Sequence, residues 1–195
     1  MFVTTEPIQM PPPHASAPTQ AGGDGLPDLL APGLEVVFCG INPGRRAAAS
    51  GHHFEGRGNR FWRVLHRAGF TPTQMTPAQD RLLLAQGYGL TTAVDRSTAS
   101  ASQVAAHEFV AAAEDFSRKI IACSPRRLAF LGKAAYAGMT GRKQIAWGRQ
   151  AAPFAGTETW ILPNPSGLNR AFSLADLVAA YRALHDAVKS GARGT

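Results

Sequence analysis

The chain has 195 residues and a mass of 20.6 kDa, which is enough for one domain with a full hydrophobic core. Its formal charge is +7, which favours a polyanionic partner such as a nucleic acid. No apolar run reaches membrane-spanning length and the N-terminus lacks a signal-peptide pattern, so we expect a cytoplasmic protein with no membrane association.

The first 33 residues differ in composition from the rest of the chain. They contain 7 of the 14 prolines and no Lys or Arg, so residues 34–195 hold all 20 basic side chains and carry +10. We expect residues 1–33 to be a largely disordered extension, with a short docked piece near residues 26–30. Residues 34–195 are expected to form a single domain.

The first strand is predicted from the apolar, valine-rich run that begins at Leu34. This run ends in Gly40-Ile41-Asn42-Pro43-Gly44, in which proline fixes one φ and biases the preceding asparagine toward extended geometry. Ligands bind at the carboxyl ends of strands in open α/β sheets, so the turn indicates a binding site that includes Asn42. An ordinary structural turn is the alternative, because Asn-Pro-Gly is common turn chemistry.

Residues 45–58 are expected to form a long loop, and Asn59 is expected to cap a helix that ends at Gly69. The adjacent pair His52-His53 lacks partners at ligand spacing, so it predicts loop residues near phosphate or a pocket mouth and no metal site. The loop and the helix carry six arginines, which predict either a phosphate-facing patch or, for the helical three, a solvated face: Arg45, Arg46, Arg57, Arg60, Arg63 and Arg67.

The second strand is predicted at residues 90–94, after a short helix at 77–86, and it ends at Asp95. A carboxylate at the carboxyl end of a strand is well placed for chemistry. Two structural alternatives remain open: Asp95 pairs with Arg96 or Arg60, or it bonds its own turn.

The remaining elements complete an alternating pattern. We expect a helix at 103–122, a strand at 127–132, a strand at 158–162 and a helix at 174–189. The glycine and lysine that follow the third strand do not complete a phosphate-binding P-loop. The order of elements predicts an α/β fold with three α/β/α layers and a central parallel sheet of about four strands.

A second Asn-Pro turn follows the strand at 158–162, and it contains Asn164. Loops from the carboxyl ends of neighbouring parallel strands converge, so Asn42 and Asn164 are expected to share one site.

Five blocks occur in a characteristic order: GINPG at 40–44, FEGRGNRFW at 54–62, TTAVDR at 91–96, LGKAAY at 131–136 and LPNPSGLNR at 162–170. In these blocks the chain resembles the mismatch-specific uracil-DNA glycosylases, relatives of thymine-DNA glycosylase, from about residue 34 to 188. The resemblance implies the uracil-DNA glycosylase fold and a monofunctional enzyme without metal or cofactor. It also implies excision of uracil, thymine or modified cytosine mispaired with guanine in double-stranded DNA.

The resemblance assigns roles to individual residues. Asn42 corresponds to the asparagine that positions the water attacking the sugar C1′. Phe54 matches the aromatic that stacks on the flipped base, and Gly40 and Ile41 form part of the pocket around it. Asn164 occupies a position where better-known uracil-DNA glycosylases have a histidine.

The last block corresponds to the wedge that enters the duplex. Leu168 is expected to fill the vacated space, and Arg170 to contact the orphan guanine or a phosphate. The full set of expected DNA-binding residues is Ser166, Gly167, Leu168, Asn169 and Arg170. Arg45-Arg46 and His52-His53 depart from the family pattern, which bears on substrate breadth.

A neutral amide can orient a water molecule but cannot take its proton. From its strand-end position we therefore predict that Asp95 supplies the catalytic carboxylate that the two Asn-Pro turns lack. A non-catalytic protein that binds mispairs, and a small-molecule enzyme on a flavodoxin-like sheet, are the alternatives. We expect a monomer, because no exposed apolar stripe calls for a partner.

Overall fold

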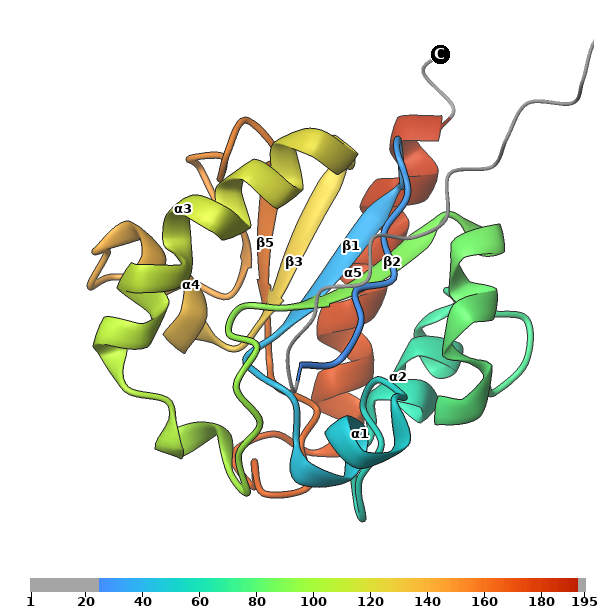
Figure 1. Cartoon of the computed structure of the whole chain (residues 1–195). Helices are drawn as coiled ribbons and strands as arrows, with labels where there is room; N and C mark the ends of the chain where they lie inside the picture. The colour runs from blue at the N-terminus through green and yellow to red at the C-terminus, as the bar shows by residue number, and fades with distance from the viewer. Residues whose placement is uncertain (1–24, 193–195) are drawn as a thin grey trace, which may run out of the picture.

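A computed structural model describes residues 25–192; of the extension predicted at residues 1–33, residues 1–24 lie outside the described part of the chain. Five strands form one sheet in the order β2-β1-β3-β5-β4 (Figure 1). Their bounds are β1 Val36–Gly40, β2 Tyr88–Thr92, β3 Arg127–Leu131, β4 Gly148–Arg149 and β5 Glu158–Leu162. The predicted parallel sheet of four strands is confirmed, and the short β4 is added antiparallel to β5.

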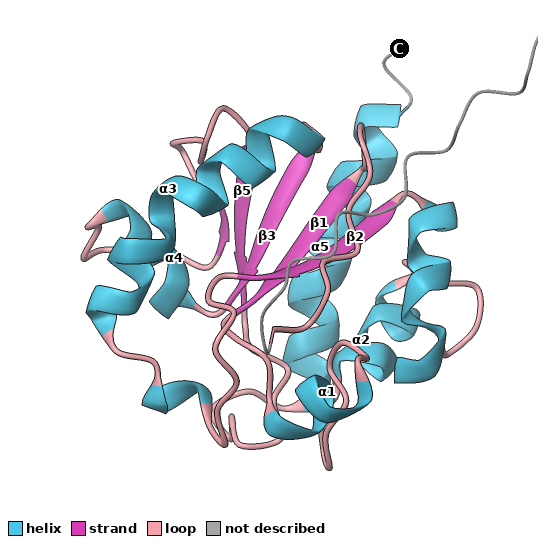
Figure 2. Cartoon of the chain, in the orientation of Figure 1, coloured by secondary structure: helices cyan, strands magenta, loops and turns pink. Residues whose placement is uncertain are grey.

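Helices cover both faces of the sheet, which confirms the three-layer architecture (Figure 2). The α-helices are α1 Arg45–Ser50, α2 Phe61–Ala68, α3 Ala106–Cys123, α4 Lys133–Thr140 and α5 Leu174–Ala192, and two 3₁₀ helices are η1 Pro77–Gln86 and η2 Ala101–Gln103. Helices α2 and α5 pack together on one face, and α3 and α4 pack together on the other. None of the helices in the described residues is long and apolar enough to cross a membrane.

Alternating residues of β1 belong to two separate cores. Val36 and Phe38 pack with α2 and α5, whereas Val37 and Cys39 pack on the α3 side. All of them are buried, because a parallel strand covered by helices on both faces leaves neither side to water.

Three local elements differ from the sequence-based prediction. The loop expected at 45–58 begins with α1, since Ala47–Ala49 favour helix and Gly51 ends it at φ 76°. The helix expected at 77–86 is a 3₁₀ helix. The second strand is displaced toward the N-terminus, because pairing with β1 aligns Gly40 with Thr92, where both strands end.

Part of the segment before residue 34 belongs to the packed structure. Leu26 and Leu29 are buried, and the Leu29 amide donates to the Leu90 carbonyl over 2.8 Å. Asp28 accepts a 2.6 Å hydrogen bond from the Thr91 hydroxyl. The docked piece near residues 26–30 is therefore present, and the domain includes residues before 34.

Candidate active site

The segments that follow β1, β2 and β5 gather at the carboxyl edge of the sheet, at the bottom of Figure 1. They enclose a hollow of about 130 Å³. A second hollow of about 90 Å³ adjoins it and shares Gly40, Asn42 and Phe54 with it. The first hollow brings together most of the residues predicted from the sequence: Gly40, Ile41, Asn42, Phe54, Asn164, Ser166 and Leu168.

The amide group of Asn42 has a fixed orientation. Its Nδ2 donates to the Arg96 carbonyl over 2.8 Å and to the Thr98 hydroxyl oxygen over 2.7 Å. A carbonyl can only accept, and the Thr98 hydroxyl gives its own proton to the Ser100 carbonyl at 2.8 Å. The nitrogen of the amide must therefore face these acceptors, and the Oδ1 of Asn42 has no donor among residues 25–192.

Phe54 forms a wall of both hollows. Its backbone lies in the left-handed region at φ 57°, which is strained for a bulky side chain. Its ring stacks on Phe61, with centroids 3.8 Å apart and planes 21° apart. A Cβ on Gly40 would lie 3.6 Å from the Phe54 ring, so a glycine leaves room beside it.

Asn164 uses its oxygen to shape its own turn. The Oδ1 accepts from the Ser166 amide at 2.9 Å, and the Asn164 carbonyl accepts from the Asn169 side chain at 2.8 Å. The Nδ2 of Asn164 has no acceptor within the described part of the chain. Asn164 lines the same hollow as Asn42 and has a donor there that is not used within the described residues.

The 163–172 loop presents Leu168 to solvent with 72% of its surface exposed. Gly167 and Arg170 are exposed beside it. The Asn169 side chain is used inside the loop, where it donates to the Asn164 carbonyl. The loop therefore has an apolar tip with a cation next to it.

The structure does not bring Asp95 to either hollow. The 93–98 segment runs beside the 40–45 turn, with the Ala93 amide donating to the Gly40 carbonyl at 2.9 Å. Asp95 is exposed and its Cβ lies against Gly25. Because β2 ends at Thr92 and not at residue 94, Asp95 lies beyond the edge where the strand ends converge.

Glu55 is the carboxylate that lines the second hollow, together with Asn42. Sequence reasoning missed this residue as a catalytic candidate. The sequence contains a feature that could have identified it: Glu55 is adjacent to Phe54 and is the single carboxylate between residues 45 and 67.

Two buried polar atoms in the second hollow lack hydrogen-bond partners within residues 25–192: His53 Nδ1 and Thr92 Oγ1. His53 is 1% exposed, and its Nε2 lies 2.9 Å from the Pro27 carbonyl. The carbonyl requires the proton on Nε2, so Nδ1 is a bare acceptor. Burial lowers the pKa of His53, which keeps the ring neutral at pH 7. His53 was expected in a loop near phosphate or a pocket mouth; it lies in a loop and lines the second hollow, but its side chain is buried.

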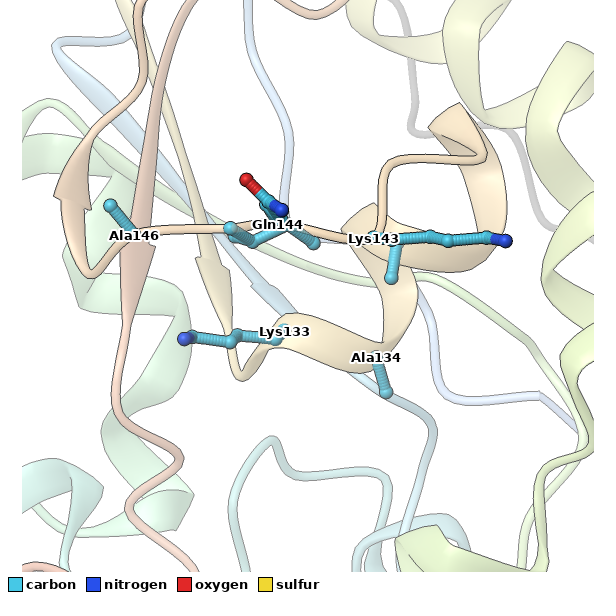
Figure 3. A pocket seen from close by; sticks show the side chains of 7 residues that line it. Lys133, Ala134, Lys143, Gln144 and Ala146 are labelled. Carbon is cyan, nitrogen blue, oxygen red and sulfur yellow. The ribbon is translucent and has the colours of Figure 1, made fainter.

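A larger hollow of about 650 Å³ lies elsewhere, between α4 and residues 143–146 (Figure 3). The side chains of Lys133 and Lys143 extend in opposite directions there. None of the turn residues described above lines it, so its size does not make it the reactive site.

The chain is similar to known proteins in sequence and in fold. The sequence profile of the uracil DNA glycosylase superfamily matches residues 27–185. A solution NMR structure of a Methanosarcina acetivorans protein, proposed to be a uracil DNA glycosylase, superposes with a TM-score of 0.55 at 25% sequence identity. The superposition covers 83% of this chain and 97% of that chain.

Proposed function

Because the chain belongs to the uracil DNA glycosylase superfamily, we propose that it is a monofunctional glycosylase that removes uracil mispaired with guanine from double-stranded DNA. The observation that carries this proposal is the fixed Asn42 amide: Asn42 lines a hollow together with Phe54 and Asn164, and its Oδ1 has no hydrogen-bond donor among residues 25–192. Thymine and modified cytosines opposite guanine belong to the same proposed substrate class.

The hollows suit a planar base that has left the helix. The exposed face of Phe54 offers stacking, because Phe61 supports the opposite face. The bare His53 Nδ1 and the Thr92 hydroxyl lack partners among the described residues, and a base that carries a donor, such as the N3–H of uracil, supplies one. Flipping costs a few kcal/mol and is least costly for a mispair, which favours uracil opposite guanine.

The hydrolysis requires a water molecule held against the sugar. We assign this water to the Oδ1 of Asn42, which accepts one of its hydrogens. The water oxygen bonds to C1′ while the bond from C1′ to the base nitrogen breaks, and the base departs with the bonding pair. The Nδ2 of Asn164 donates to the departing base and stabilises its negative charge.

The proton released by the water needs an acceptor. We assign it to the carboxylate of Glu55, which lines the hollow that contains Asn42. Asp95, the acceptor predicted from the sequence, lies outside both hollows.

We assign the recognition of duplex DNA to the 163–172 loop. Leu168 is an exposed apolar side chain that can fill the space vacated by the base. Arg170 follows at the same tip and can contact the unpaired guanine or a phosphate.

Single-turnover release of base from a labelled duplex with one G·U pair tests the proposal. We expect release by the wild type, none by Asn42→Ala, and a loss confined to duplex substrate for Leu168→Ala. The affinity for the duplex, measured at increasing salt concentration, gives the contribution of contacts to the DNA phosphates. Specific binding of the mispair without release of base from any substrate would instead support a non-catalytic mispair-binding protein.

A further inference from the structure

Arg60 makes an unusual set of contacts. Its guanidinium donates to four backbone carbonyls of the 163–172 loop: Nε to Pro165 at 3.3 Å, Nη1 to Phe172 at 2.8 Å, and Nη2 to Ser166 at 3.0 Å and Asn169 at 2.8 Å. The Arg60 amide also donates to the Pro165 carbonyl at 3.0 Å. No carboxylate of residues 25–192 forms an ion pair with it.

These contacts span the loop from one end to the other. Pro165 and Phe172 flank the tip, and Ser166 and Asn169 lie on either side of Leu168. A guanidinium has five N–H donors in a fixed planar fork, whereas the lysine ammonium is a compact charge with three. Only arginine can therefore bind carbonyls so far apart in the loop at one time.

Burial of the tip residue contributes little to holding the loop in this conformation. Leu168 is 72% exposed, so it gains almost no burial from the conformation in which it is held. An exposed loop with an apolar tip loses conformational freedom when it orders, and a preformed loop avoids that loss on binding. The neighbouring residue, Phe61, supports Phe54 by stacking, so consecutive residues of one helix start support both the base-stacking wall and the tip.

We propose that Arg60 is a positioning residue that holds the 163–172 loop in the shape required for Leu168 to enter a duplex. The entry of Leu168 into a duplex rests on the proposed function. The hydrogen bonds by which Arg60 clamps the loop are a property of the free protein. The sequence predicted the same phosphate-facing role for all six arginines of the 45–67 segment. The proposal gives Arg60 a different role from the other five.

The test compares Arg60→Lys with Arg63→Lys, a matched control on the exposed side of the same helix. Hydrogen exchange of the free proteins is measured first. We expect amides of the 163–172 loop to exchange about tenfold faster in Arg60→Lys, with the strands unchanged, and no change in Arg63→Lys. Unchanged loop exchange in Arg60→Lys would overturn the clamp, whatever the enzyme activity proves to be.

Single-turnover excision then tests the consequence. We expect Arg60→Lys to slow release from a G·U duplex about tenfold and release from single-stranded DNA less than about twofold. Combined with Leu168→Ala, it should cause no further loss, because both changes remove the same action. Equal loss on both substrates, or additive loss in the double variant, would contradict the proposal.

Two results separate this inference from the proposed function. If the wild type releases no base, the proposed function fails, and hydrogen exchange still decides the clamp. If Arg60→Lys unfolds, Arg60→Gln is measured in the same way, and the loop exchange is compared with that of the strands. Fast exchange throughout both variants would show a general structural role and contradict specific positioning.

Discussion

The amide nitrogen of Asn42 donates to the hydroxyl oxygen of Thr98 over 2.7 Å, across 56 positions of sequence. Together with the contact from the same nitrogen to the Arg96 carbonyl, this contact determines which end of the Asn42 amide faces the hollow. Thr98 is 5% exposed and contributes no charge, so its effect on the reaction acts through Asn42.

Replacing Thr98 by valine keeps the shape of the side chain and removes the acceptor. We expect base release to slow about fivefold, because one hydrogen bond worth about 1 kcal/mol no longer orients the amide. Single-turnover kinetics on a G·U duplex measures this effect. Thr98→Ser keeps the hydroxyl and serves as the control; an equal loss in both variants would indicate a packing defect.

Glu55 and Asp95 are the two candidates for the carboxylate that accepts the proton of the attacking water. We expect Glu55→Gln to slow single-turnover release about 100-fold, as for loss of a general base, and to flatten the pH dependence of the rate. The variant Asp95→Asn tests the acceptor predicted from the sequence under the same conditions, and we expect it to retain activity. A large loss in Asp95→Asn with full activity in Glu55→Gln would restore Asp95 and remove Glu55.

Gly167 lies against the backbone of Gly58. A Cβ at residue 167 would come within 2.7 Å of the Gly58 carbonyl oxygen, which cannot move without the chain. We expect Gly167→Ala to displace the 163–172 loop and to slow duplex excision about tenfold, with single-stranded substrate spared. Gly56→Ala is the control, because its Cβ would meet no atom within 4 Å.

The burial of His53 makes the free energy of unfolding depend on pH. Its pKa in the folded protein is lowered by burial, so the unfolded chain binds the proton at a higher pH than the folded one. The free energy of unfolding is therefore greatest above the ordinary histidine value of 6.5 and falls as the pH drops below it. Denaturant unfolding at several pH values between about 5 and 8 measures this slope.

The variant His53→Gln should lose less stability on acidification than the wild type, because it carries no titrating ring. It tests His53 directly, since other histidines remain in place. An identical pH slope in the two proteins would show that His53 does not contribute.

The sequence by itself determined the layered α/β fold and the two Asn-Pro turns that follow β1 and β5. Strand periodicity and proline geometry are local properties, so they can be recognised without knowing what packs against them. The convergence of Asn42 and Asn164 on one hollow followed from the rule that parallel strands end at a common edge, whereas Phe54 was assigned to the same pocket from the family resemblance.

Only the tertiary structure decided the positions of the charged and buried polar groups. Asp95 was expected at the strand end, but pairing with β1 ends β2 at Thr92 and leaves Asp95 exposed. Arg60 was one of six similar arginines until its guanidinium was found beneath the 163–172 loop. His53 is buried because residues 26–29 pack on the domain and supply the Pro27 carbonyl. Each of these contacts joins segments distant in sequence, and local pattern carries no information about such pairings.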